Sequence, residues 1–141
     1  MTSDERAVLR ANEAFYAAFR AHDLVAMDIL WSREAPVMCV HPGWEPIIGR
    51  DAVLGAWRAI FEGDVPEVEV RDARASLLGD VACVVCLEVV SDADGERRGV
   101  MSATNLFVRE GSGWRVVHHH AGPVAPDDED EASEDEPRLL N

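Results

Sequence analysis

The stretch VACVVCLEVV, residues 81–90, is the part of the sequence that decides the fold. Valine, leucine and cysteine fill most of its positions, and β-branched side chains of this kind favour strands. Glu88 is its only charged residue. Because successive side chains of a strand point to opposite faces, a run that is apolar in both directions predicts a strand buried on both faces.

Three more strand candidates surround this one, at 66–75, 97–109 and 114–121, with turn residues at 78–80, 92–95 and 110–113. Turns this short join antiparallel neighbours, so the sequence predicts a four-strand meander. A further short strand is expected at 37–41 (VMCVH), before the turn signal Pro42-Gly43. His41 would then lie at the end of that strand.

The N-terminal half has the 3.6-residue period of helices. Thr2 and Glu5 have capping-box spacing ahead of a first helix, and Asp23 can cap a second, shorter one. The segment GRD at 49–51 predicts the start of a third helix, which Gly63 ends. Helices first and strands second indicate an α+β domain, with three N-terminal helices packed on a strongly curved mixed or antiparallel sheet.

Local helices can cover only one face of that sheet. The strand at 81–90 is apolar on both faces, so the second face must be buried as well. A second copy of the chain is the simplest cover. We therefore expect a homodimer built sheet against sheet.

The length of 141 residues suits one domain, which we place at residues 1–124, followed by an acidic tail at 125–141. Residues 127–141 carry seven of the fourteen net negative charges and few apolar side chains. Such a run cannot offset the entropy lost on ordering, which predicts a disordered, solvated tail rather than a binding segment.

Residues 1–126 carry the other seven net negative charges. All thirteen basic residues of the chain are arginines. An acidic surface repels phosphate backbones and anionic lipids, which bind to clusters of Lys and Arg. Neither nucleic acid nor a membrane is therefore an expected partner. The N-terminus MTSDERAVLR lacks the basic and apolar regions of a signal peptide, and no stretch is long and apolar enough to span a membrane. These features predict a cytoplasmic protein.

The three cysteines are an odd number, which disfavours structural disulfides. Cys83 and Cys86 form a C-x-x-C pattern, but residues three apart on a strand point to opposite faces. Buried, inert thiols are favoured over a redox or zinc site.

The run His118-His119-His120 could be a metal site. Alternate residues of a strand share a face, so His118 and His120 could both bind one ion. No third ligand lies nearby in the sequence. Structural or interfacial histidines are favoured, and no metal is expected.

Four short motifs, taken in order, point to a known fold. They are HD at 22–23, VHPGW at 40–44, GRDAV at 49–53 and GWRVVHHHAGP at 113–123. Together with the order of elements they resemble the NTF2-like superfamily, in particular SnoaL-like bacterial proteins and the association domains of calcium/calmodulin-dependent kinases. The resemblance covers residues 3–124 and implies an NTF2-like cone.

The resemblance implies a cone-shaped pocket for a small apolar or carbonyl-containing molecule, with no cofactor. His41-Pro42 matches the place where ketosteroid isomerases of this superfamily carry their general base, an aspartate before a proline. Asn105 matches their oxyanion-binding carboxylic acid, and an amide can donate a hydrogen bond to an oxyanion. His41 and Asn105 are therefore the candidate catalytic residues.

Aromatic residues are expected in the wall of this pocket. The isomerases' oxyanion tyrosine matches Phe15, and Tyr16 stands one residue further, about 100° around the helix. Two more of their aromatic positions match Trp31 and Trp57. Trp44 follows His41 in the VHPGW motif, and tryptophans of this kind are either core or pocket wall.

Glu88 is expected to point into the cone, where a carboxylate is costly unless paired or protonated. It is either a functional carboxyl, or a structural group paired with Arg115 or lying at a water-filled floor. In the functional reading His41 removes a proton next to a carbonyl, Asn105 donates to the developing oxyanion, and Glu88 or His119 orients or reprotonates. The chain is then an isomerase, cyclase or dehydratase; the alternative is a non-catalytic homodimeric association or ligand-sensing module.

Overall fold

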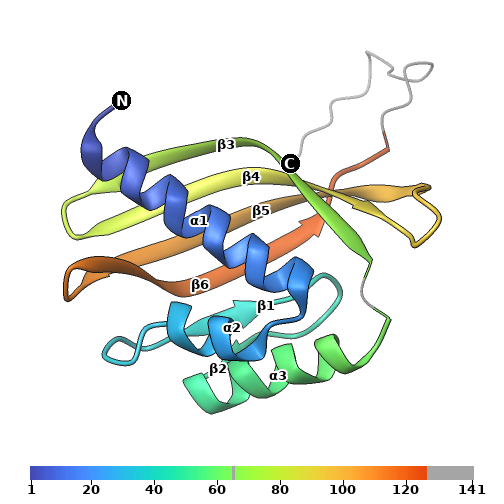
Figure 1. Ribbon diagram of the computed structural model, residues 1–141, viewed down its shortest axis with the longest axis horizontal. Coiled ribbons are helices and arrows are strands. Elements are labelled where there is room, and N and C mark those ends of the chain that lie inside the picture. The colour runs from blue at the N-terminus through green and yellow to red at the C-terminus, as the bar shows by residue number, and fades with distance from the viewer. Residues whose placement is uncertain (65, 127–141) are drawn as a thin grey trace.

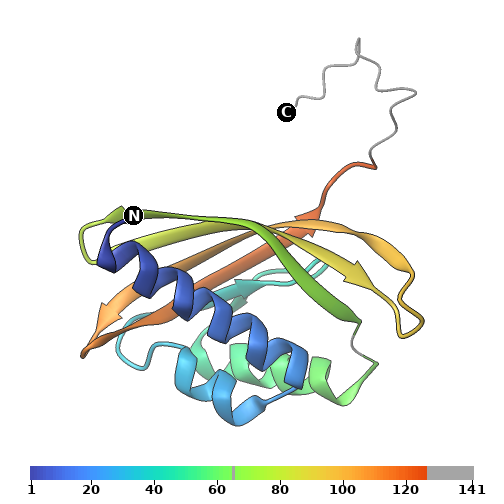
Figure 2. The ribbon, with the colours of Figure 1, turned by 45° about the horizontal axis from the view of Figure 1, so that its top comes forward.

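The computed structural model of the protein describes residues 1–64 and 66–126, and the predicted tail segment 127–141 lies outside them. Three helices pack on one face of a six-strand sheet, as the sequence predicts. The sheet arches over the helices, and the long first helix runs across its concave face (Figures 1 and 2).

The first two helices begin where their capping residues predict, and the third begins directly after Gly49 without a side-chain cap. Thr2 and Glu5 form the expected capping box, and the side chain of Asp23 accepts a hydrogen bond from the backbone of Ala26. His22 ends the first helix in the left-handed conformation, with φ of 54°. The helices are α1 (Ser3–Ala21), α2 (Leu24–Leu30) and α3 (Arg50–Glu62).

The sheet has the strand order β2-β1-β6-β5-β4-β3. Its strands are β1 (Met38–Val40), β2 (Ile47–Ile48), β3 (Glu67–Leu78), β4 (Val81–Ser91), β5 (Arg97–Glu110) and β6 (Gly113–Pro123). The predicted antiparallel meander is confirmed for β3 to β6. Two features were not predicted: β2, which is only two residues long, and the parallel pairing of β1 with β6.

The two faces of β4 differ in burial. Ala82, Val84 and Cys86 point toward the helices and are buried, whereas Val85 on the outer face is 45% exposed. The apolar outer face predicted from the sequence is thus partly exposed in the single chain, at Val81 and Val85, while Val89 on the same face is buried. Within residues 1–64 and 66–126, no helix combines the length and the apolar composition needed to cross a lipid bilayer.

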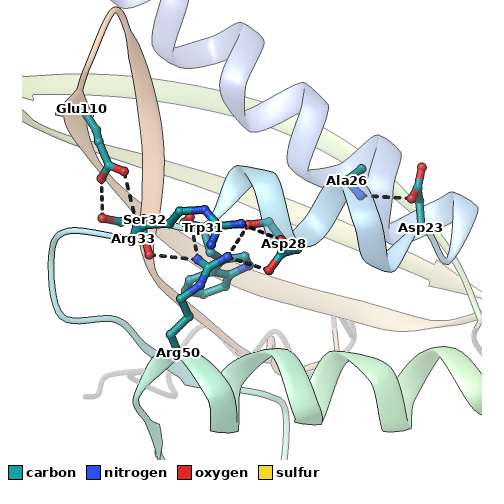
Figure 3. A network of polar contacts seen from close by, with 8 residues as sticks. All are labelled: Asp23, Ala26, Asp28, Trp31, Ser32, Arg33, Arg50 and Glu110. Atoms are coloured by element: carbon teal, nitrogen blue, oxygen red, sulfur yellow. Dashed lines mark hydrogen bonds and ion pairs between the residues drawn. The ribbon is translucent and has the colours of Figure 1, made fainter.

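A polar clamp holds the end of α2 (Figure 3). The Arg50 guanidinium donates to the carbonyl oxygens of Asp28, Trp31 and Ser32 at 2.6–2.9 Å, and to the Asp28 carboxylate at 2.7 Å. The Ser32 hydroxyl in turn donates to Glu110 at the end of β5. These bonds satisfy carbonyls that a helix end leaves open, and they join α2 to α3 and to the sheet.

Candidate functional site

Five polar side chains meet in the interior between α1 and the sheet. Asn12 and Tyr16 stand one turn apart on α1, so they share a face. Glu88 projects inward from β4, and Asn105 and His119 are direct cross-strand partners on β5 and β6. All five are at most 3% exposed. We call them the central cluster.

Hydrogen bonds connect every member of the central cluster. The Tyr16 hydroxyl donates to Glu88 Oε2 at 2.6 Å. Asn105 Nδ2 donates to Asn12 Oδ1 at 2.9 Å and to the Tyr16 oxygen at 3.2 Å. Asn105 Oδ1 lies 2.6 Å from His119 Nδ1. Buried polar groups are tolerated when they are paired in this way.

The bonds of Asn105 fix the tautomer of His119. Since Asn105 Nδ2 donates to two oxygens, its Oδ1 is the atom that faces the imidazole, and an amide oxygen only accepts. His119 therefore carries its proton on Nδ1. Its other ring nitrogen, Nε2, is left with a lone pair 4.0 Å from Glu88 Oε2.

Burial changes the acidity of the two oxygen acids in the central cluster. It raises the pKa of Glu88, and the hydrogen bond from Tyr16 offsets this only in part. The pKa of Tyr16 is raised far above its ordinary value, first by burial and then by the charge of Glu88. The Tyr16 hydroxyl is therefore a permanent donor, while Glu88 can hold or release a proton nearer to neutral pH.

His41 lies beside the central cluster, in an aromatic cage. Its ring packs edge-on against Trp57 at 4.7 Å and Trp44 at 5.1 Å, and lies 5.9 Å from the His119 ring. Its Nε2 is 3.4 Å from the sulfur of Cys39. Burial raises the pKa of the Cys39 thiol to about 12, so the pair is neutral and Cys39 is not a nucleophilic thiolate.

The two interior histidines make stability sensitive to acid. Burial lowers the pKa of His41 to about 4, and burial together with the nearby His41 lowers that of His119 to about 3. Both are neutral in the fold, while the unfolded chain takes up protons below about pH 6.5. Their contribution is therefore complete above pH 6.5 and is lost as the pH falls toward 4 and then 3.

We expect the free energy of unfolding, measured with urea, to fall between pH 6.5 and 4 by about 3 kcal/mol from His41 alone. Glu88 acts in the opposite direction, because its raised pKa favours the fold at low pH. His41→Gln should flatten the pH dependence. Equal slopes for the wild type and His41→Gln would contradict the prediction.

The structure brings most of the predicted site residues together. Phe15 is in contact distance of its neighbours, with its ring centroid 5.0 Å from His119 and 5.6 Å from Trp57. Trp44 is different, because it is 45% exposed and covers His41 from outside. The residues that line or form the interior are Phe15, Tyr16, Trp31, His41, Trp57, Glu88, Asn105 and His119.

The predicted structural pairing of Glu88 with Arg115 was wrong. Its carboxylate does not pair with Arg115, because Arg115 stands on the outer face of β6 and the Tyr16 hydroxyl occupies the carboxylate instead. Tyr16 also reaches further inward than its one-residue offset suggested, since α1 crosses the concave face of the sheet (Figure 2) and its Tyr16 hydroxyl meets Glu88 on β4. Asn12 was missed, although its position one turn before Tyr16 was a usable signal.

The structure shows on which face of the sheet the cysteines and histidines of β4 and β6 lie. Cys86 is buried inside as expected, whereas Cys83 lies on the outer face and is only half-buried. His119 points inward, while His118 and His120 lie outside, where His118 Nδ1 is 3.2 Å from the carbonyl oxygen of Met38. Within the described chain, no three potential metal-binding side chains gather at one point.

A cavity of about 560 Å³ reaches the central cluster from outside. It lies between α1 and β3, and Asn12 and Tyr16 form part of its wall. The indole N–H groups of Trp31 and Trp57, elsewhere in the interior, have no hydrogen-bond partner among the described residues. An unpaired buried donor costs about 1–3 kcal/mol, so these groups could donate to a bound molecule.

Solved structures of similar proteins support the fold. A protein of Streptomyces avermitilis, provisionally assigned as a dehydratase of the NTF2-like family, is 32% identical, with a TM-score of 0.79 over 88% of this chain and 98% of that one. A Thiobacillus denitrificans protein, provisionally assigned as a calcium/calmodulin-dependent protein kinase type II association domain, is 36% identical, with a TM-score of 0.74 over 81% and 92%.

The F-box protein SKIP8 of Arabidopsis thaliana is 30% identical over 125 residues, which are 88% of this chain. The chain spans about half, 52%, of that relative's length. The family model of the SnoaL-like domain matches residues 8–126. The chain therefore belongs to the SnoaL-like family and has the NTF2-like fold that its motifs predicted.

Proposed function

We propose that this protein is an enzyme that moves protons on a small, largely apolar, carbonyl-containing molecule without a cofactor, as an isomerase, cyclase or dehydratase does. One observation carries the proposal: a carboxyl, a phenol and an imidazole are hydrogen-bonded together in an otherwise apolar interior. Proton transfer requires groups of this kind in reach of each other, and titratable groups with shifted pKa values gather at functional sites.

Glu88 is the proton-transferring group in this proposal. Its raised pKa brings it nearer to the pH at which a carboxyl both accepts and returns a proton. The Tyr16 hydroxyl, 2.6 Å away, stabilises negative charge on the carboxylate or on a substrate oxygen that takes its place. His119 Nε2, with its lone pair toward Glu88, accepts a hydrogen bond from a bound group, and the imidazole stays neutral because burial lowers its pKa to about 3.

Asn105 acts as a positioning residue, because its amide is already bonded to Asn12, Tyr16 and His119. His41 lines the interior between Trp44 and Trp57. It becomes a base only for a substrate that reaches it, since burial holds its pKa near 4. The unpaired indole N–H of Trp57 supplies a donor for a substrate carbonyl.

The test is a screen of enolisable carbonyl compounds and hydratable lipophiles, followed by two variants. Glu88→Gln keeps the shape of the side chain and should lower kcat by at least about a hundredfold. Glu62→Gln makes the same chemical change at an exposed end of α3 and should leave kcat unchanged. Equal activity of Glu88→Gln and wild type would contradict the role of Glu88.

A second function, a homodimeric association or ligand-sensing module, is favoured by the outer face of the sheet. Met38 and Val85 are 43% and 45% exposed there, and the likeness to a kinase association domain extends over most of the chain. We propose that this face pairs with a second copy. Binding without turnover in the screen would favour the module, and a monomer in sedimentation at micromolar concentration would contradict the dimer.

A further inference from the structure

The cavity between α1 and β3 has a charged end, at Arg20, and an apolar end, at Leu9 and Ala73. The C-terminal end of α1 lies over the start of β3, because the Arg20 guanidinium contacts the carbonyl oxygen of Val68. Leu9 and Ala73 therefore lie toward the other end. Leu9 and Arg20 are eleven residues apart, about 16 Å along the helix. We call this cavity the α1–β3 groove; its lining is Leu9, Asn12, Glu13, Tyr16, Arg20, Val68, Glu69, Val70 and Ala73.

A β-bulge shapes the groove. The register of β3 against β4 shifts between Arg71 and Arg74, and Asp72 adopts a left-handed φ of 56°. A bulge bends its strand, and β3 is the edge strand of the sheet, so it is free to bend. Ala73, directly after the bulge, puts only a methyl group into the groove.

The groove lies directly beside the central cluster. Tyr16 and Asn12 belong to both. Val70, which lines the groove, is the cross-strand partner of Glu88 on β4, and partners of this kind project side by side on the same face. A molecule lying in the groove is therefore one side chain away from the carboxyl group.

Arg20 gives the groove one charged end. Among the residues that the structure describes, its guanidinium makes one long hydrogen bond, 3.4 Å to the carbonyl oxygen of Val68. Within residues 1–64 and 66–126, no carboxylate lies within 4.0 Å of it. Glu67 and Glu69 flank Val68 on β3, and Glu69 is paired with Arg71 at 3.1 Å. Glu13 stands two turns away along α1, about 10 Å.

We propose that the α1–β3 groove binds an apolar molecule with one anionic end group, such as a carboxylate. The anion lies against the free donors of Arg20, where a charge-assisted hydrogen bond forms. The apolar body lies on Leu9, Val70 and Ala73, next to Tyr16. This proposal rests on the proposed function in that the bound molecule is the substrate of the central cluster.

Two fluorescent probes with the same aromatic body test the proposal. One is 8-anilino-1-naphthalenesulfonate, which is anionic, and the other is N-phenyl-1-naphthylamine, which is neutral. Arg20→Gln should weaken the affinity for the anionic dye by about tenfold, in line with the loss of one charged hydrogen bond, and leave the neutral dye unchanged. Arg10→Gln removes the same charge from an exposed part of α1 and should change neither affinity.

Ala73→Trp fills the groove and should weaken both dyes at least tenfold. Ala73→Leu is a smaller change and should weaken the binding of both dyes less strongly. It replaces the tryptophan variant in the test if circular dichroism shows that the tryptophan variant does not fold. Unchanged binding of both dyes in the folded Ala73 variants, or equal losses in Arg20→Gln and Arg10→Gln, would overturn the proposal.

The two proposals fail in different ways. Dye binding that follows these expectations, together with no turnover in the carbonyl screen, keeps the groove and removes the enzymatic function. Turnover that Glu88→Gln abolishes but the folded Ala73 variants leave unchanged keeps the enzyme and removes the groove as its substrate site.

Discussion

Replacing Trp57 with alanine is expected to lower the free energy of unfolding by about 3–5 kcal/mol. Trp57 is completely buried, and its ring lies against those of Phe15, Phe19 and His41 at 4.7–5.6 Å. Its removal deletes this contact area and leaves a cavity that rigid strands cannot close. Urea unfolding measured by circular dichroism would report the loss.

Arg58→Ala is the matched control, because Arg58 is the next residue of α3 and is exposed. It should change stability by less than about 0.5 kcal/mol. Trp57→Phe should cost less than Trp57→Ala, since it restores most of the volume and removes the unpaired indole N–H. A Trp57→Ala variant as stable as Arg58→Ala would show that α3 does not close the interior.

The second large effect is expected for Asn105→Ala, which should cost about 2–4 kcal/mol of folding free energy. Its amide serves three buried groups, and truncation leaves the Nδ1–H of His119 and the Oδ1 of Asn12 without partners. Each abandoned buried group costs about 1–3 kcal/mol. Thr104→Ala, on the outer face of the same strand, should cost less than about 1 kcal/mol.

The variant Asn105→Asp keeps the volume of the side chain, so it tests the effect of Asn105 on His119 apart from its contribution to packing. The new carboxylate keeps an acceptor beside His119 Nδ1 and adds a negative charge, which should raise the pKa of His119 above its value of about 3. Nitrogen chemical shifts of the imidazole measured against pH would report both the tautomer and the pKa. A similar loss for Asn105→Ala and Thr104→Ala, or an unchanged His119 titration, would contradict the positioning role.

Local features of the sequence account for most of the fold. Capping residues such as Thr2 and Asp23 satisfy the backbone within one helical turn, so their effect is visible in a few consecutive residues. The strands from β3 to β6 follow one another through short turns, which leaves little freedom in their pairing. The parallel pairing of β1 with β6 joins segments far apart in the chain, and no local pattern encodes it.

The sequence, together with the family resemblance, also predicted which candidate residues face inward: side chains alternate along each strand, and the resemblance indicates which side of the sheet holds Glu88, Asn105 and His119. Only the tertiary structure decided what they contact. Tyr16 rather than Arg115 bonds Glu88 on β4, and Asn12 bonds Asn105 on β5, because α1 crosses the concave face of the sheet (Figure 2). Such contacts depend on how a helix is placed against a sheet, which packing of distant side chains sets and sequence spacing does not.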